Sequence, residues 1–316
     1  MEAEGLLPGF LARRASAALR ASARWALAAA GFAAAVLALA GLPLLVSETT
    51  GRLVLEPGRV LGAAGGFLRA FADGSAFVFR SGYTSWDFRA LGPRFLWVSF
   101  AYTALPGALG IGIGAFVGSA FRTRRRGAWD RLADFVLATP DFLIIFLAQL
   151  CSTWLVDALG PLFPRPRSPG PFAVLPMALM SLFPALLAYR AAATASPRVE
   201  GEPFVAFARA KGLPERTVLR RHVGAALIPA IEAELPVIIA FMQGSLFFTE
   251  KAFGIPGMAR LLYDSAFAGR RRVVLRAIYQ YDHVVLSLLG LAVSCVATYC
   301  ALRLSLSLAR RALTRE

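Results

Sequence analysis

Long blocks of hydrophobic residues, separated by arginine-rich stretches, dominate the pattern along this chain. A helix needs about 17–25 apolar residues to cross the hydrocarbon core of a bilayer, where its backbone groups have to bond one another. The blocks that reach this length comprise residues 25–46, 95–120, 135–156, 172–189, 228–249 and 284–302. We therefore predict an all-α membrane protein with six transmembrane helices.

Composition supports this prediction and excludes other classes of protein. Hydrophobic residues make up 57% and charged residues 17% of the 316 residues, whereas globular chains average about 45–50% and 25%. Intrinsic disorder and a soluble enzyme are both inconsistent with these values. The 3 cysteines lie inside apolar blocks and the 2 histidines lie far apart, so we expect neither a disulfide framework nor a metal site.

The net charge is +15, from 34 lysines and arginines against 19 acidic residues. Only Lys211 and Lys251 are lysines, and most of the arginines lie between the apolar blocks. Arginines in such positions face lipid headgroups and the membrane potential. Because the chain offers no basic and aromatic module for nucleic acid, we expect these charges to face the bilayer and no nucleic acid to bind.

The orientation follows from the basic residues of the short loops. The tightest cluster, Arg122 with residues 124–126, adjoins the second block, and such clusters mark the cytoplasmic side. Both termini are therefore predicted to be cytoplasmic. The first block could instead be a signal peptide, because residues 38–40 (Ala-Leu-Ala) are similar to a cleavage site. Its length of about 22 residues, against about 7–15 for the hydrophobic region of a cleaved signal peptide, favours a retained anchor.

These features divide the chain into four segments. Residues 1–24 form a cytoplasmic N-terminal segment, and residues 25–94 hold the first span and a long extracytoplasmic loop. Residues 95–308 form a core of five spans with a cytoplasmic loop at 194–227, and residues 309–316 form a cytoplasmic tail. We also expect a small helix in the long outer loop, because apolar residues recur there at helical spacing.

The second block contains a run of closely spaced glycines. Residues 110–118 read GIGIGAFVG, in which Gly110, Gly114 and Gly118 recur every four residues. Glycines at this spacing form a flat helix face that lets another helix approach closely. The run is not a dinucleotide-binding loop, because it lies inside an uncharged block with no strand before it. We expect it to pack against a neighbouring span.

Two polar residues lie inside predicted spans. Asp141 follows Pro140 in the third block, and Gln243 lies in the fifth. A carboxylate in the membrane has to face a pore, a partner helix or a free backbone amide. Asp141 therefore either caps the helix after the proline or lines a polar translocation path. Gln243 is the second candidate for such a path.

The loop between the fourth and fifth blocks carries the most informative sequence. Residues 204–216 read FVAFARAKGLPER. Phe204, Phe207 and Ala208 fall on one face of a predicted helix. We expect Gly212 to end this helix in a left-handed conformation, and the Pro-Glu pair that follows to start the next helix. The resulting hairpin either lies in the lipid headgroups or serves as a docking site for a cytoplasmic partner.

The same stretch resembles the coupling loop of ABC importer permeases, and within these the dipeptide, oligopeptide and nickel permease family. Residues 250–262 (EKAFGIPGMARLL) resemble that family's outer loop after span five, and residues 79–82 and 127–131 match further family positions. Two features differ from the family pattern. The acidic residue that begins the wider superfamily's motif is absent, and residues 270–272 are three arginines where an acidic and aromatic stretch is expected.

The resemblance implies a type I importer permease fold in the bacterial inner membrane. It also implies a second permease subunit, two cytoplasmic ATPase subunits and an extracytoplasmic solute-binding protein as partners. The ATPase contact is expected at Phe204, Phe207, Ala208, Arg209, Lys211, Gly212, Leu213 and Glu215. The implied function is to couple ATPase movement to the translocation of peptides or of a related small solute or metal chelate.

The chain itself offers no energy source. A nucleotide-binding P-loop reads G-x-x-x-x-G-K-[ST], and neither Lys211 nor Lys251 follows a glycine. No motif pairs a nucleophile with a base, so we expect neither an enzyme nor a cofactor. A separate ATPase partner explains the exposed hairpin. The alternatives are a membrane scaffold or assembly factor without transport activity and a proton-coupled secondary transporter.

Overall fold

A computed structural model describes residues 6–49, 52–81, 84–120, 126–159, 174–267 and 279–314. These residues are mainly helical, with two short antiparallel strand pairs. The prediction of an all-α membrane protein is confirmed, and the strand pairs are an addition that hydropathy does not reveal. The chain divides into two compact units, Met1–Asp87 with Tyr279–Leu289 and Phe88–Ile278 with Gly290–Glu316.

The first unit combines a long helix with a region of short elements. Its elements are α1 (Leu6–Gly41), a 3-10 turn (Leu42–Leu44), β1 (Val46–Thr49), β2 (Arg52–Leu55), α2 (Pro57–Asp73), a second 3-10 turn (Ser75–Phe77), β3 (Val78–Ser81) and β4 (Thr84–Asp87). β1 pairs with β2 and β3 with β4. The small helix expected in the long outer loop is α2.

Close contacts join α1 to its neighbours in this unit. The end of α1 approaches α2 so closely that a Cβ added at Gly41 would lie 2.3 Å from Cγ1 of Val60. The hydroxyl of Tyr281 donates a hydrogen bond to the carbonyl of Leu37 at 2.9 Å. The first unit thus has a packed interior of its own.

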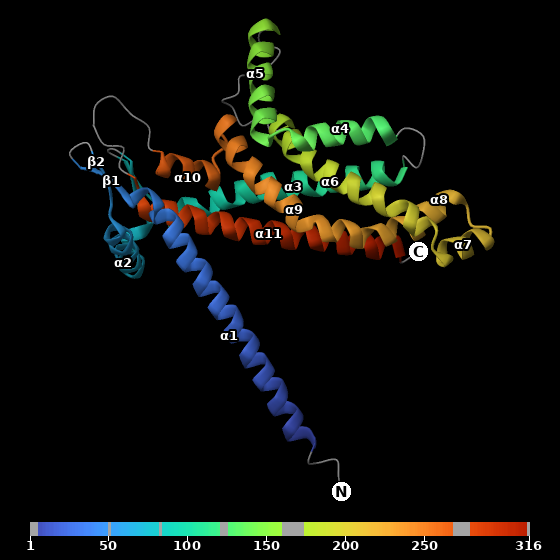
Figure 1. Cartoon of the computed structure of the whole chain (residues 1–316), viewed down its shortest axis with the longest axis horizontal. Coiled ribbons are helices and arrows are strands. Elements are labelled where there is room, and N and C mark those ends of the chain that lie inside the picture. Colours follow the sequence, from blue (N-terminus) through green and yellow to red (C-terminus); the bar gives the residue numbers. More distant parts are fainter. Residues whose placement is uncertain are drawn as a thin grey trace. The chain divides into compact units, whose positions relative to one another are not determined.

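Long helices form the core of the second unit and run side by side in Figure 1. They are α3 (Phe88–Ala120), α6 (Val174–Glu200), α9 (Gly224–Ala252) and the part of α11 (Tyr281–Thr314) from Gly290 onward. One stripe of α9 is almost completely buried, and it comprises Ile231, Leu235, Ile238, Met242 and Leu246. Residues at these three- and four-residue intervals lie on one side of a helix, so that side of α9 is the centre of the packed bundle.

The contacts along α3 give the direction of α6. A Cβ at Gly110 would meet the carbonyl of Ser181, and a Cβ at Gly118 would meet Ala192. Residue numbers rise together along both helices, so α3 and α6 run in the same direction. The chain between them therefore returns toward the end at which α3 began. The described helices on this return are α4 (Arg126–Ala138) and α5 (Asp141–Leu159).

The described residues contain five helices that are long and apolar enough to cross a membrane: Ser22–Leu44, Phe88–Ser119, Val174–Glu200, Glu215–Ala252 and Tyr281–Thr314. α4 and α5 satisfy the same test as a pair, but they bend by 95° between Ala138 and Asp141. Pro140 lies at this break and cannot continue the helical hydrogen bonding. The predicted third span, 135–156, is therefore not one straight helix, and the count of six stays a prediction.

Several helices extend beyond the predicted boundaries. α6 continues to Glu200 and α9 begins at Gly224, so both ends of the predicted loop at 194–227 are helical. The hydropathy pattern marks only the part of a helix that lies in hydrocarbon, while its hydrogen bonds continue into the polar region. The arginines at 122–125 and at 270–272 lie outside the described residues.

Candidate functional site

A helical hairpin occupies the end of the bundle where α6 stops and α9 begins (Figure 1). It consists of α7 (Pro203–Ala210), a turn, α8 (Glu215–Thr217) and a π-helical segment (Val218–Val223) that leads into α9. Its inner side forms a buried cluster that comprises Ala192, Val205, Ala208, Val218, Val223 and Leu227. Because Ala192 belongs to α6 and Leu227 to α9, this cluster attaches the hairpin to both helices.

The two phenylalanines of α7 point away from this cluster. Phe204 is 44% exposed and Phe207 is 61% exposed, whereas Ala208 is 2% exposed. The expectation that Phe204, Phe207 and Ala208 fall on one face of the helix is therefore wrong for Ala208. Successive residues on a helix are about 100° apart, so Ala208 turns toward the buried cluster while Phe207 stays outside.

The turn after α7 depends on Gly212. Gly212 has a φ of +73°, which confirms the predicted left-handed conformation. Its N–H donates to the carbonyl of Arg209 at 2.9 Å, and the N–H of Leu213 donates to the carbonyl of Ala208 at 3.4 Å. This pair of bonds is a Schellman motif, which satisfies carbonyls at the helix end. A Cβ at Gly212 would meet no atom within 4 Å, so the requirement for glycine comes from the backbone conformation alone.

Charged side chains close the hairpin on its outer side. Arg209 donates to both carboxylate oxygens of Glu215, at 3.0 and 3.2 Å. The hydrogen bonds that Arg209 donates to Glu215 raise the pKa of Arg209 above its ordinary value. Nζ of Lys211 lies 4.6 Å from the ring centroid of Phe207, and Leu213 is exposed in the turn. The hairpin therefore presents two aromatic rings and the cation of Lys211 beside a turn that the ion pair closes.

The π-helical segment is a feature that sequence reasoning missed. Val218 and Val223 are both buried, and a helix with i→i+5 hydrogen bonds places residues five apart on the same side. Such π segments are frequent at functional sites. Residues 218–223 read VLRRHV, which contains neither glycine nor proline, so composition offers no signal for this change of helix type.

The glycine run packs against the backbone of α6. A Cβ at Gly114 would lie 2.0 Å from the carbonyl oxygen of Ala185, and a Cβ at Gly110 would lie 2.4 Å from that of Ser181. A Cβ at Gly118 would lie 2.7 Å from the carbonyl oxygen of Tyr189. Real Cβ atoms do not approach so closely, because the distances are well inside van der Waals contact. Only glycine therefore permits the observed approach of α3 to α6.

Asp141 is the first residue of α5, directly after the break at Pro140. Its Oδ1 accepts a hydrogen bond from the N–H of Phe142 at 2.8 Å, and its Oδ2 accepts one from the hydroxyl of Ser245 at 2.8 Å. The carboxylate thus satisfies a backbone N–H of α5 and joins that helix to α9. The structure brings Asp141 together with Ser245 and not with Gln243. Nε2 of Gln243 is buried without a hydrogen-bond partner among the described residues.

A buried carboxylate organises the opposite end of the bundle. Glu250, near the end of α9, is fully buried, and its Oε1 accepts a hydrogen bond from the hydroxyl of Ser99 at 2.5 Å. Its Oε2 accepts one from the N–H of Arg260 at 2.9 Å. The hydroxyl of Ser99 in turn accepts from the N–H of Met258 at 2.7 Å. Glu250 therefore joins α3, α9 and the first turn of α10 (Met258–Ala266).

Glu250 belongs to the outer-loop motif at residues 250–262, but the motif alone predicts no role for its side chain. The sequence contains one sign of this role: Glu250 lies at the end of an apolar block, seven positions before Gly257, the residue that precedes α10. Carboxylates stabilise helix N-termini because the first N–H groups have no partner inside the helix. Within the described residues, no group of three histidine, cysteine or acidic side chains is placed to hold a metal ion.

Known proteins with similar sequences are transport proteins. The oligopeptide transport system permease protein AmiC of Streptococcus pneumoniae is 29% identical over 191 residues, which cover 58% of this chain and 37% of that protein. The dipeptide transport system permease protein DppB of Lactococcus lactis is 29% identical over 164 residues, 50% of this chain and 52% of the relative. The oligopeptide transport system permease protein OppB of Escherichia coli is 35% identical over 98 residues, which cover 30% of this chain and 31% of that protein.

The chain thus covers from 31% to 52% of the length of these relatives. Their names describe permease proteins and no enzyme, and the resemblance seen in the sequence is confirmed. Residues 110–316 match the family described as the inner membrane component of binding-protein-dependent transport systems. The match begins at the glycine run and includes the hairpin, the polar contacts of Asp141, and Glu250 with α10. Because it spans more than half of the chain, this protein belongs to the family of binding-protein-dependent transport system inner membrane components.

Proposed function

We propose that this chain is a permease subunit of an ATP-driven importer of peptides, and that the hairpin is its docking site for a separate ATPase subunit. The single observation that carries the docking proposal is the division of α7 into two sides. Val205 and Ala208 are buried against α6 and α9, while Phe204 and Phe207 are exposed. Exposed aromatic side chains on a rigid frame are typical anchors of protein interfaces. The names of the relatives support peptides as the solute class.

The fold offers a route by which movement of the hairpin reaches the other end of the bundle. α9 has 29 residues, which corresponds to about 43 Å at 1.5 Å per residue. One end of α9 is attached to the hairpin through Leu227 of the buried cluster. The other end holds α10 through the carboxylate of Glu250. A partner that displaces the hairpin therefore displaces α9, and with it the position of α10.

The solute path of this subunit involves the polar region around α5 and α9. Asp141 and Ser245 form a hydrogen bond there, and Gln243 on the same helix has a buried amide without a partner among the described residues. Polar groups buried in membrane helices are costly, and those that occur there typically mark substrate or ion paths. A second permease subunit completes the path, and an extracytoplasmic solute-binding protein delivers the solute to it.

The energy source is tested by reconstitution. The chain, purified with its co-purifying subunits and placed in proteoliposomes, is expected to take up labelled peptide only with ATP and the solute-binding protein. A proton uncoupler should leave that uptake unchanged. Uptake that continues without ATP and stops with the uncoupler would show a secondary transporter, and purification without any ATPase subunit would favour a scaffold.

The proposed orientation places both termini and the hairpin in the cytoplasm. It is tested by cysteines placed at two predicted loop positions, Ser168 and Thr123. An impermeant thiol reagent added outside should label Ser168→Cys and leave Thr123→Cys unlabelled. The reverse pattern of labelling would overturn the orientation while leaving the fold unaffected.

A further inference from the structure

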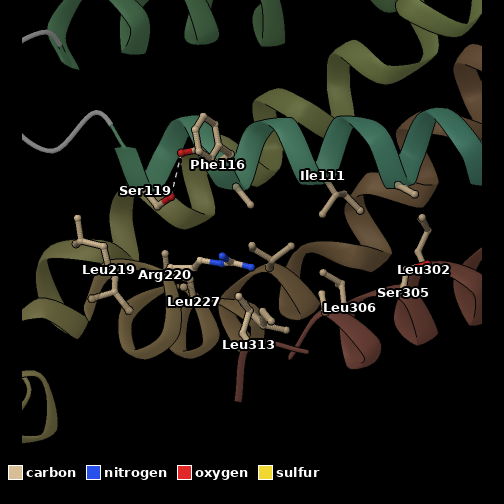
Figure 2. Close-up of a pocket in the computed structure, with 18 of the residues that line it drawn as sticks. Ile111, Phe116, Ser119, Leu219, Arg220, Leu227, Leu302, Ser305, Leu306 and Leu313 are labelled. Atoms are coloured by element: carbon tan, nitrogen blue, oxygen red, sulfur yellow. Dashed lines mark hydrogen bonds between the residues drawn. The ribbon is translucent and has the colours of Figure 1, made fainter. Parts of the chain in front are cut away.

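A cavity of about 650 Å³ lies between α3, the segment from α8 into α9, and the end of α11 (Figure 2). This volume lies within the range of about 300–1,000 Å³ that is usual for small-molecule sites. Its walls are mainly aliphatic and include Ile111 of α3, Leu227 of α9 and Leu306 of α11. At its hairpin end the lining includes Arg216 and Arg220.

The arginines are the polar groups of this lining that lack a partner within the described part of the chain. Ser119 and Ser305 donate their hydroxyls to carbonyls of their own helices, at 2.9 and 2.8 Å. Arg216 and Arg220 form no ion pair with a described acidic residue. Figure 2 shows the side chain of Arg220 directed into the cavity. The site thus combines an apolar chamber with an unneutralised cationic end.

This chemistry favours a ligand with an anionic head and an apolar body. A phosphate forms strong, charge-assisted hydrogen bonds with guanidinium groups, and an acyl chain satisfies aliphatic walls without hydrogen bonds. A translocated peptide fits poorly, because its backbone N–H and C=O groups would find almost no partners along these walls. An apolar helix of another subunit would leave the two arginines without a counter-charge.

We propose that the cavity binds an anionic glycerophospholipid, with an acyl chain between α3, α9 and α11 and the phosphate at Arg216 and Arg220. The bound lipid fills the space beside the hairpin and neutralises its adjoining cations. The proposal depends on the membrane location of the chain and not on the proposed transport of peptides. Gly112 offers an independent means to test it, because it lines the cavity and a Cβ there would meet no atom within 4 Å.

The test measures lipid retained by the full-length chain after purification in mild detergent from membranes of phosphatidylglycerol and phosphatidylethanolamine. Arg216→Gln with Arg220→Gln should reduce retained phosphatidylglycerol by about thirtyfold, the factor that corresponds to about 1 kcal/mol for each arginine near an anionic lipid. Gly112→Leu, which fills the chamber and keeps both arginines, should reduce it as well. The matched control, Arg198→Gln with Arg310→Gln, removes two exposed arginines outside the lining and should retain lipid like the wild type.

A photocrosslinking residue at Ala309, on the cavity wall, identifies the occupant directly. An adduct with the mass of a phospholipid would support the proposal. An adduct with a second permease subunit or with added peptide would overturn it. Equal retention of phosphatidylglycerol by the wild type and the arginine variant, or equal retention of phosphatidylglycerol and phosphatidylethanolamine by the wild type, would also overturn it. Each of these readouts is independent of uptake, so loss of transport and loss of lipid are distinguishable.

Discussion

The carboxylate of Glu250 occupies the space in which a side chain at Gly257 would begin. A Cβ added to Gly257 would lie 2.0 Å from Oε1 of Glu250. The same carboxylate accepts hydrogen bonds from Ser99 and from the N–H of Arg260. The absence of a side chain at Gly257 therefore allows a buried carboxylate to reach the first turn of α10.

Gly257→Ala should displace this carboxylate and leave buried hydrogen-bonding groups unsatisfied. We expect the free energy of unfolding to fall by about 1–3 kcal/mol, with faster proteolysis near α10. Thermal unfolding of the purified chain and limited proteolysis measure both effects. Gly127→Ala is the control, because a Cβ at Gly127 would meet no atom within 4 Å. Equal stability of the two variants would contradict this role of Gly257.

The glycine face of α3 allows a matched comparison within a single helix. Gly114→Ala forces a Cβ against the carbonyl of Ala185, and we expect a loss of about 1–3 kcal/mol in stability, as for other overpacked sites. Gly112→Ala enters open space and should be neutral or slightly stabilising, because alanine has the higher helix propensity. The melting temperatures of Gly114→Ala and Gly112→Ala, each compared with that of the wild type, measure the two effects. A similar effect at both positions would mean that close packing against α6 is not essential.

Phe207→Ala should detach the ATPase subunit or uncouple ATP hydrolysis from uptake, while the chain still inserts normally. Truncation of an aromatic anchor in an interface can cost about 2 kcal/mol or more of binding energy. Lys211→Ala should have a mild effect, because exposed charges contribute little. The assay is co-purification of the ATPase and peptide uptake at matched membrane levels. Phe135→Ala, which truncates an exposed phenylalanine of α4, is the control. If Phe207→Ala kept full ATPase binding and uptake, the hairpin would only lie in the lipid headgroups and would not be a docking site.

Gly212→Val should uncouple ATP hydrolysis from peptide uptake more severely than Phe207→Ala does. Valine strongly disfavours a φ of +73°, and the left-handed conformation costs a residue with a Cβ about 1 kcal/mol or more. The Schellman turn would then open and change the angle between α7 and α8. Gly212→Asn should retain most of the activity, because asparagine tolerates this conformation. Uptake and ATPase binding that fail equally in both variants would point to a cause other than the backbone conformation.

Asp141 is tested with two substitutions of different character. If Asp141 lines the solute path, Asp141→Leu should lower uptake while the complex still assembles. Asp141→Asn keeps an oxygen that can accept the hydrogen bond from Ser245 and should preserve assembly. Uptake and assembly are measured separately. Wild-type uptake in Asp141→Asn, together with only reduced expression of Asp141→Leu, would limit the residue to its structural contacts at the start of α5.

The features that the sequence predicts correctly depend on local physics. A run of apolar residues is long enough to cross a membrane whatever its neighbours are, and the left-handed conformation of Gly212 follows from the end of its own helix. The spacing of Gly110, Gly114 and Gly118 likewise indicates a flat helix face within one helix. In each case the residues that decide the structure lie within a few turns of one another.

The tertiary structure alone decided which groups meet across the bundle. The glycine face does not specify α6 as its partner, and nothing in α7 shows that Ala208 turns inward until Val218 is packed against it. Glu250 and Ser99 lie 151 positions apart in the chain, and Asp141 and Ser245 lie 104 apart. Such pairs form because docked helices share limited space and because leaving a buried polar group unpaired costs free energy. Hydropathy and helical spacing describe each helix separately, so they cannot identify these partners.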